Sequence, residues 1–425
     1  MKSLKLFFLF FLGTVNFQLS AQNNPNFYLH ENGVTCMCTN AAVGEMGTVN
    51  GVTYTKRTRE QITTENASTT CTSGITDMSR LFSEQSLYTS INSWDVSAVI
   101  DMSYMFYATY FNQPIDRWDT SSVIDMSYMF THANQFNQPI GNWDVSKVKN
   151  MSYMFASLAA FNQSLSNWNT SNVTNMSFMF FYNQDFNQPI GSWDVSNVTN
   201  MSFMFQGAIF DQPIENWNVG NVTDMSGMFA SYTYPSSFNQ PIGNWNVSNV
   251  KNMSSIFNGA TFNQPIGNWN VSKVISFSNL FFGARTFDQN INAWNTQNVT
   301  DFSSTFKNVN NFNQPLDNWN TSNVVNMSGM FDGALNFNQP IASWNTSKVV
   351  TMNNMFRNAL EFNQSLNTWD VSNVKNFERM FMTTNNFNQD LSEWDVSNAI
   401  NLELMFHYSR NFNQNFNLKF LFFNR

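Results

Sequence analysis

Asp or Asn follows each of the 13 Trp residues of this 425-residue sequence, at a position where a carboxylate could act as an acid, a base or a metal ligand. A catalytic carboxylate does not tolerate exchange for an amide, because an amide has no titratable proton at neutral pH. A hydrogen-bond acceptor for a nearby backbone amide does tolerate it. We therefore predict a structural acceptor at this position. The carboxylates are Asp95, Asp119, Asp144, Asp194, Asp370 and Asp395, and the amides are Asn169, Asn218, Asn246, Asn270, Asn295, Asn320 and Asn345.

The first three carboxylates have an alternative role. If Asp95, Asp119 and Asp144 stack along the molecule, like charges face one another and repel unless a cation lies between them. A Ca²⁺ site at these three residues is the alternative hypothesis, and we predict no other metal site and no cofactor. The sequence has three His residues, far apart, and no phosphate-binding glycine loop, nucleophile elbow or zinc-protease helix. We predict no catalytic residues and no enzymatic activity.

The three cysteines, Cys36, Cys38 and Cys71, all precede the Trp-containing part of the chain. In an oxidising compartment one disulfide is expected. A bond between Cys36 and Cys38 would be cramped, so the candidates are Cys36–Cys71 and Cys38–Cys71. One thiol is left over in either case.

The N-terminal residues have the pattern of a secretory signal peptide. Lys2 and Lys5 precede an apolar run over residues 6–12, and Ser20-Ala21 offers a small-residue cleavage site. No other segment is apolar for 18 residues, so no transmembrane segment is expected in the mature chain. The net charge is −8 with no basic cluster, whereas a nucleic-acid binder needs concentrated positive charge. We expect a secreted or cell-surface protein that does not bind nucleic acid.

The Trp residues mark an internal repeat. The intervals between them are 24 or 25 residues, except for 28 residues between Trp217 and Trp245. Self-similarity at this period is typical of stacked supersecondary units that share one continuous core. The domain organisation expected is a signal peptide over 1–21, an N-terminal cap over 22–74, a solenoid of about 13 repeats over 75–416, and an irregular end over 417–425.

One copy of the repeat spans residues 136–155. Its Ile-x-x-Trp-x-Val core matches the leucine-rich-repeat frame, and Trp143 and Val145 would point to one face of a short strand. An apolar stripe follows with helical spacing, and Ser146 before it could cap that helix. The fold predicted is an α/β repeat solenoid, leucine-rich-repeat-like, with one short parallel strand and one short helix per repeat. The stripe in this copy comprises Val148, Met151, Met154 and Phe155.

Two further positions are informative. Every repeat contains a Phe-x-Gln triplet, and its Gln recurs at the same repeat position from Gln113 to Gln414. An amide at a fixed repeat position predicts a ladder of hydrogen bonds along the stack. The residue between the two core Met positions is aromatic in the first five full units and small or polar in the later ones. An exposed aromatic stripe there would be a candidate ligand-binding surface, and the alternative is that the rings only pack on the neighbouring unit. The stripe comprises Tyr104, Tyr128, Tyr153, Phe178 and Phe203.

The repeat Phe-Asn-Gln-Pro-Ile-x-x-Trp-Asp-Val-Ser-x-Val-x-x-Met-Ser-x-Met-Phe resembles that of the BspA-like bacterial surface proteins, whose repeat also occurs in mycoplasma surface lipoproteins. The resemblance covers residues 75–416, and the segment 47–60 resembles the lead-in to such arrays. It implies a divergent leucine-rich repeat and adhesion at the cell surface through an extracellular protein or glycan ligand. The sequence departs from the family in having no lipid-attachment Cys after the signal peptide. Its last residues break off inside a fourteenth unit, which suggests a truncated reading.

Two functions fit these observations. The first is a secreted or surface binding protein, which needs the aromatic stripe to be exposed. The second is a structural spacer that self-associates end to end through an uncapped solenoid end. A spacer gives no reason for aromatic residues to be confined to the first five units.

Overall fold

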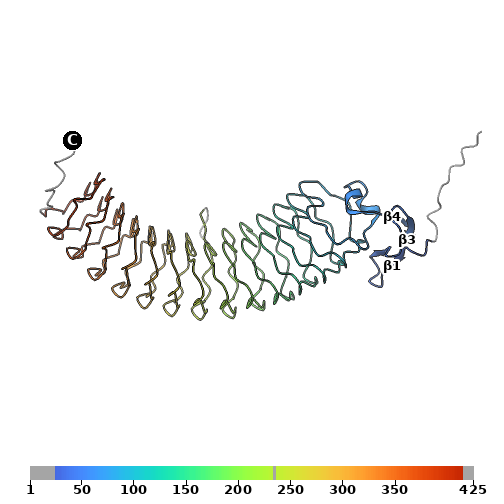
Figure 1. The fold of residues 1–425 in the computed structure, drawn as a ribbon, viewed down its shortest axis with the longest axis horizontal. Helices are drawn as coiled ribbons and strands as arrows, with labels where there is room; N and C mark the ends of the chain where they lie inside the picture. The colour runs from blue at the N-terminus through green and yellow to red at the C-terminus, as the bar shows by residue number, and fades with distance from the viewer. Residues whose placement is uncertain (1–23, 233–235, 415–425) are drawn as a thin grey trace, which may run out of the picture.

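The computed structural model describes residues 24–232 and 236–414, which form a curved rod of stacked coils (Figure 1). The named strands lie together at the N-terminal end of the rod, and the coils follow one another to the C-terminal end. The predicted signal peptide and the predicted irregular end lie outside the described residues. In the part that is described, no helix is long and apolar enough to cross a bilayer.

Two small sheets form the N-terminal end. One pairs β1 with β2 antiparallel, and the other has the order β3-β4-β5, with β5 parallel to β4. Asn50 and Gly51 turn the β3–β4 hairpin, and both have the positive φ that a two-residue hairpin loop requires. The elements are β1 (Tyr28–Leu29), β2 (Cys36–Met37), β3 (Met46–Val49), β4 (Val52–Lys56), the 3₁₀ helices η1 (Arg59–Gln61) and η2 (Ala67–Thr69), and β5 (Thr70–Cys71).

The repeats form a solenoid, but the helix predicted in each unit is wrong. Among the described residues the helices are the two short 3₁₀ helices. Tyr104, inside the predicted helical stripe, has φ 57°, which a right-handed helix excludes. The amide of Met105 donates to the Met102 carbonyl and that of Tyr107 to the Tyr104 carbonyl, so the segment is a run of overlapping β-turns. Between these bonds, the amides of Tyr104 and Phe106 donate to the next coil.

The strand predicted at Trp143 and Val145 is also wrong. Both side chains are buried, as expected, but the Trp143 amide donates to the Ile140 carbonyl in a β-turn. The parallel pairing lies a few residues further on, where single bridges link successive coils, such as Asn150 to Asn175. These bridges run in series from Asp77 to Asn401, so the chain stacks in parallel without a strand longer than one residue in each coil.

The core is a set of side-chain columns that run through the stack. Phe rings of neighbouring coils stack about 6 Å apart, as in Phe106 and Phe130 at 5.6 Å. Each indole N–H donates to an Ile or Leu carbonyl of the preceding coil, as Trp143 does to Ile115 at 3.0 Å, except that Trp94 of the first coil donates to Ala67 in η2. Because the indole N–H needs a partner when buried, this bond explains why the position takes Trp and no other aromatic residue.

The two polar positions of the repeat are confirmed as hydrogen-bonding groups. The Asp or Asn after each Trp accepts from the backbone amide two residues on, as Asp144 does from Ser146 at 2.9 Å. Ser146 is therefore the donor in a turn, and the helix cap predicted for it is wrong. The Gln ladder is also present. Gln138 donates to Asn112 of the preceding coil at 2.8 Å, and the acceptor at this position is Asn in most coils and Asp211 or Asp288 in two of them. Equivalent bonds recur along the stack as far as Gln414.

Candidate functional site

The aromatic stripe forms a continuous ladder of five stacked rings, which we term the aromatic ladder. It consists of Tyr104, Tyr128, Tyr153, Phe178 and Phe203, one from each of five successive coils. Successive ring centroids are 4.3, 4.4, 4.3 and 4.7 Å apart. The planes of the first four rings lie within 9° of their neighbours, and the last contact is tilted by 23°. The rings therefore lie face to face along the rod.

Both ends of the aromatic ladder are closed. The Arg80 guanidinium lies 3.8 Å from the centroid of the Tyr104 ring, a cation–π contact. At the other end, a Cβ on Gly227 would lie 2.2 Å from the Phe203 ring, so Phe203 occupies space that only a glycine leaves free. The structure thus bounds the surface at five coils.

All five rings are half-buried. Because their faces contact one another, the ring edges and the Tyr hydroxyl groups are what the ladder offers to a partner. Burial between its neighbours raises the pKa of the Tyr128 hydroxyl, and the adjoining Tyr104 and Tyr153 add to the effect. Burial likewise raises the pKa of Tyr153. The hydroxyls of Tyr128 and Tyr153 therefore stay neutral over the physiological pH range.

The residues of the aromatic ladder have a backbone conformation that is unfavourable for residues other than glycine. Its five residues have φ between 56° and 58°, the left-handed region that costs a non-glycine residue about 1–2 kcal/mol. The next six coils fill this position with residues that adopt the region more readily or are small, and the last two carry Arg379 and Leu404. The six are Gly227, Ser255, Asn279, Ser304, Gly329 and Asn354. The Gly and Asn at this position were the sequence signal for a positive φ, and the prediction of a helix missed it.

Three aromatic side chains beside the ladder were not predicted from the sequence. Tyr107 lies 5.6 Å from Tyr104, and Phe181 lies 5.3 Å from Phe178. His132 meets Tyr107 edge to face at 5.9 Å. They come from the positions three or four residues after the ladder, where most coils carry no aromatic residue, so the repeat pattern gave no indication of them. They widen the aromatic surface at three of its coils.

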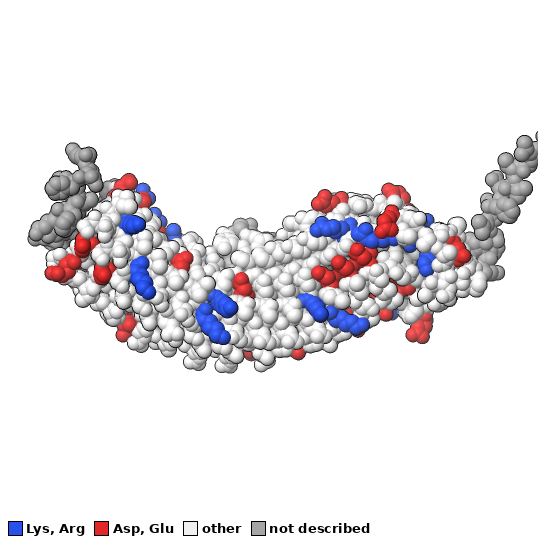
Figure 2. Space-filling view, in the orientation of Figure 1, with Lys and Arg blue, Asp and Glu red and all other residues white. Residues whose placement is uncertain are grey.

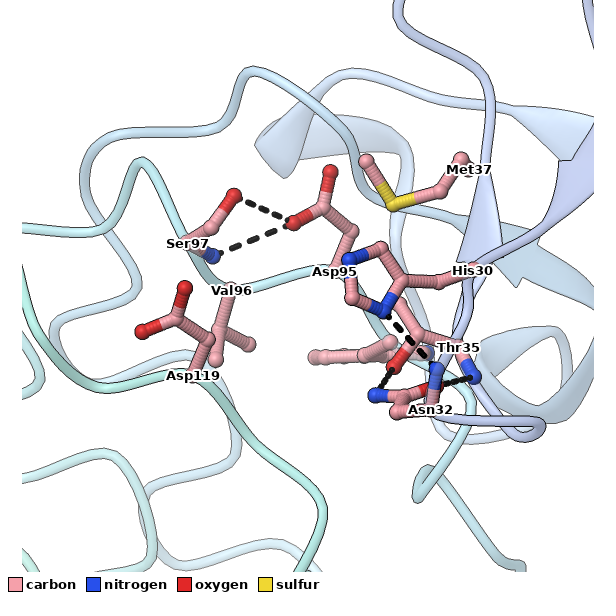
Figure 3. Close-up of a pocket in the computed structure, with 9 residues that line it drawn as sticks. His30, Asn32, Thr35, Met37, Asp95, Val96, Ser97 and Asp119 are labelled. Atoms are coloured by element: carbon pink, nitrogen blue, oxygen red, sulfur yellow. Dashed lines mark hydrogen bonds between the residues drawn. The ribbon is translucent and has the colours of Figure 1, made fainter. Parts of the chain in front are cut away.

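The three carboxylates of the Ca²⁺ hypothesis are not brought together. Asp95 and Asp119 line a pocket of about 40 Å³ with His30, while Asp144 is not part of its lining (Figure 3). The Asp95 carboxylate accepts from both the amide and the hydroxyl of Ser97. Nδ1 of His30 accepts from the Asn32 amide. This space holds only a few water molecules. Within residues 24–232 and 236–414, no group of three His, Cys, Asp or Glu could hold a metal ion.

The cysteines tie the N-terminal sheets together. Of the two candidate pairings, the structure has Cys38–Cys71, which joins β5 to the segment after β2. Cys36 is a buried free thiol. Burial, with a contribution from Asp95, raises the pKa of Cys36 to about 12, so it is unreactive at neutral pH.

Charge is sparse over the rest of the rod. Figure 2 shows a face on which most residues are uncharged, with a row of acidic side chains over the first coils, further acidic residues near the C-terminal end, and Lys and Arg in short groups along the rod. One buried carboxylate, Asp332, pairs with Arg357 at 2.7 Å and Lys307 at 3.2 Å, from the coils on either side. Its neighbours neutralise it, so it is a structural clamp between three coils.

Comparisons with known proteins agree with the repeat. The family model described as "Mycoplasma protein of unknown function, DUF285" matches four times, at residues 53–167, 135–235, 210–317 and 301–419. A search of the curated proteins gave no match.

Among solved structures, the plant peptide hormone receptor RGFR1 in complex with RGF2 is 11% identical, with a TM-score of 0.27 over 75% of this chain and 55% of the receptor. The chain thus spans about half of that receptor. An internalin, InlF, from Listeria monocytogenes is 9% identical, with a TM-score of 0.19 over 83% of this chain and 88% of the internalin. Such low TM-scores mean that the chains superpose poorly.

Proposed function

This chain belongs to the DUF285 family of Mycoplasma proteins of unknown function, and we propose that it is an extracellular binding protein whose aromatic ladder contacts a partner protein. The binding surface is the edge of the five stacked rings, extended by Tyr107 and Phe181. Its location outside the cell rests on the predicted signal peptide, the Cys38–Cys71 disulfide and the resemblance to BspA-like surface proteins.

The observation that carries the proposal is that the coil does not need aromatic residues at this position. Other coils keep the left-handed backbone at this position, and the amide's hydrogen bond to the next coil, with side chains that are not aromatic: Gly227, Ser255, Asn279 and Arg379. The left-handed region costs about 1–2 kcal/mol for any of the non-glycine residues, so it does not select aromatic side chains. The stack therefore forms without aromatic residues here. A surface that is dispensable for the fold and enriched in Tyr is typical of a binding site.

The exposed chemistry favours a protein over a sugar as the partner of the ladder. A sugar ring stacks on an aromatic face, and here the faces are covered by neighbouring rings or by Arg80. Ring edges and a row of hydroxyl groups instead suit a partner surface with both apolar side chains and hydrogen-bonding groups.

The test is binding of purified residues 22–425 to an array of extracellular matrix and cell-surface proteins. The variant changes three ladder residues, Tyr104→Asn, Tyr128→Asn and Tyr153→Asn, because Asn adopts the left-handed region readily and occurs there in later coils. The matched control changes three exposed Tyr residues outside the ladder, at Tyr88, Tyr110 and Tyr232, also to Asn.

We expect at least one protein on the array to bind, with a loss of tenfold or more in affinity in the ladder variant and little change in the control. Unchanged binding in the ladder variant would refute the proposal. An array with no binder at all would favour the structural spacer, for which the ladder has no role.

A further inference from the structure

A second candidate site begins two coils after the last coil of the aromatic ladder, where three successive coils enclose an open hollow of about 380 Å³. Volumes of roughly 300–1,000 Å³ are usual for sites that bind small molecules. The same short segment of each coil, which follows the Phe-x-Gln triplet, provides the lining. The first two coils contribute Pro241, Gly243 and Asn244, and then Pro265, Gly267 and Asn268.

Two glycines open the hollow. A Cβ on Gly243 would lie 2.4 Å from the carbonyl oxygen of Pro265, and a Cβ on Gly267 would lie 2.6 Å from that of Asn290. Both positions therefore need glycine where the coils lie this close. In the sequence, Gly141 and Gly191 are each followed one coil later by Ser or Glu, whereas Gly243 and Gly267 are consecutive. Two adjacent coils thus lack a side chain at the same place.

The polar groups around the hollow are amides. Asn244 and Asn268 are exposed, and neither side chain makes a hydrogen bond within the described residues. On the third coil, Gln289 donates to Asn263 at 3.0 Å, which fixes the side chain and leaves its oxygen as an acceptor. Asn290 accepts from the Asn292 amide at 3.0 Å, which leaves its NH₂ group as a donor. The site therefore combines donors and acceptors, some held in place and some free.

We propose that this hollow binds a neutral oligosaccharide. Side-chain amides pair a donor with an acceptor, which matches adjacent sugar hydroxyl groups, and the rings of Pro241 and Pro265 offer apolar contact to the C–H face of a sugar. None of the lining residues is charged, so a charged ligand would lose its hydration without a counter-ion. The site shares no residue with the aromatic ladder and does not depend on the function proposed for it.

The experiment uses residues 22–425 on an array of neutral and anionic oligosaccharides, followed by calorimetric titration with the neutral oligosaccharide that gives the strongest signal. The test variant is Asn244→Ala with Asn268→Ala, two exposed side chains whose loss leaves the coil intact. The matched control is Asn142→Ala with Asn167→Ala, exposed residues at the same repeat position in two earlier coils.

We expect binding of a neutral oligosaccharide with an affinity that falls at least tenfold in the test variant and stays within twofold in the control. The proposal is overturned if no neutral oligosaccharide binds, if only anionic ones do, or if the two variants lose affinity equally. Failure of the ladder variant to affect protein binding would leave this result unchanged, since the two surfaces are separate.

Discussion

The hydrogen bond from each indole to the preceding coil can be tested with the substitution Trp269→Phe. Trp269 is 3% exposed, and its Nε1 donates to the Ile242 carbonyl at 3.1 Å. That carbonyl also accepts from the Trp245 amide, so the substitution removes one of its two bonds and leaves it partnered. The variant isolates the contribution of the side-chain bond and the lost ring area.

The expected cost follows from these two parts. Loss of one hydrogen bond whose acceptor keeps another partner costs about 0.5–1.5 kcal/mol. The smaller ring removes apolar area equivalent to about two buried CH₂ groups, at about 0.8 kcal/mol each. We therefore expect the free energy of unfolding to fall by about 2–3 kcal/mol.

The assay is equilibrium unfolding in urea, followed by the fluorescence of the remaining Trp residues. A lower midpoint with an unchanged slope reports a loss of stability without a change in the surface exposed. The control is Ile266→Val, a buried side chain of the same coil that has no polar group to lose and no ring contact. We expect about 1 kcal/mol for this control. A cost for Trp269→Phe no larger than that of the control would refute the reasoning.

Three further predictions follow from the structure. Gly227→Ala should lower the melting temperature more than Gly329→Ala. Both glycines have φ +60°, but only a Cβ at position 227 would clash with the Phe203 ring. Equal decreases in melting temperature would mean that the ring moves aside freely. Hydrogen bonds from Ser hydroxyls and backbone amides lower the pKa of Asp144, Asp194 and Asp395, so the stability they contribute is present above their ordinary pKa and is lost as the pH falls through the lowered value. With all three changed to Asn, the melting temperature should fall less between pH 7 and pH 3 than in the unmodified protein. Parallel curves of melting temperature against pH would contradict this. Cys38→Ser should lower the stability of the N-terminal sheets by about 3–4 kcal/mol, because the disulfide that it removes spans 33 residues and restricts the unfolded chain. Proteolysis of residues 24–71 measures this loss. In the unmodified protein, the buried thiol of Cys36 should not react with iodoacetamide.

The candidate surface was only partly predictable. The sequence indicated which five residues share a repeat position, but it left open whether their rings were exposed or packed. In the structure the ring faces pack against each other and the five side chains are half-buried. Tyr107 and Phe181 were missed because aromatic residues occur in only a few coils at this variable repeat position, so they produce no periodic pattern in the sequence. The hollow at Gly243 and Gly267 needs the approach of a carbonyl from the next coil, which no single repeat reveals.

The sequence by itself determined the solenoid, its period and its inward-facing residues, together with the acceptor role of Asp144 and the Gln138 ladder. Repetition makes this possible, because equivalent positions become spatial neighbours and each preference is recorded about 13 times. Only the tertiary structure decided between helix and turn. Spacing of three residues places Met102 and Met105 on one side in a helix and in overlapping β-turns alike. The choice rests on the positive φ of Tyr104, which its hydrogen bond to the next coil stabilises, and that bond forms only once the coils are stacked.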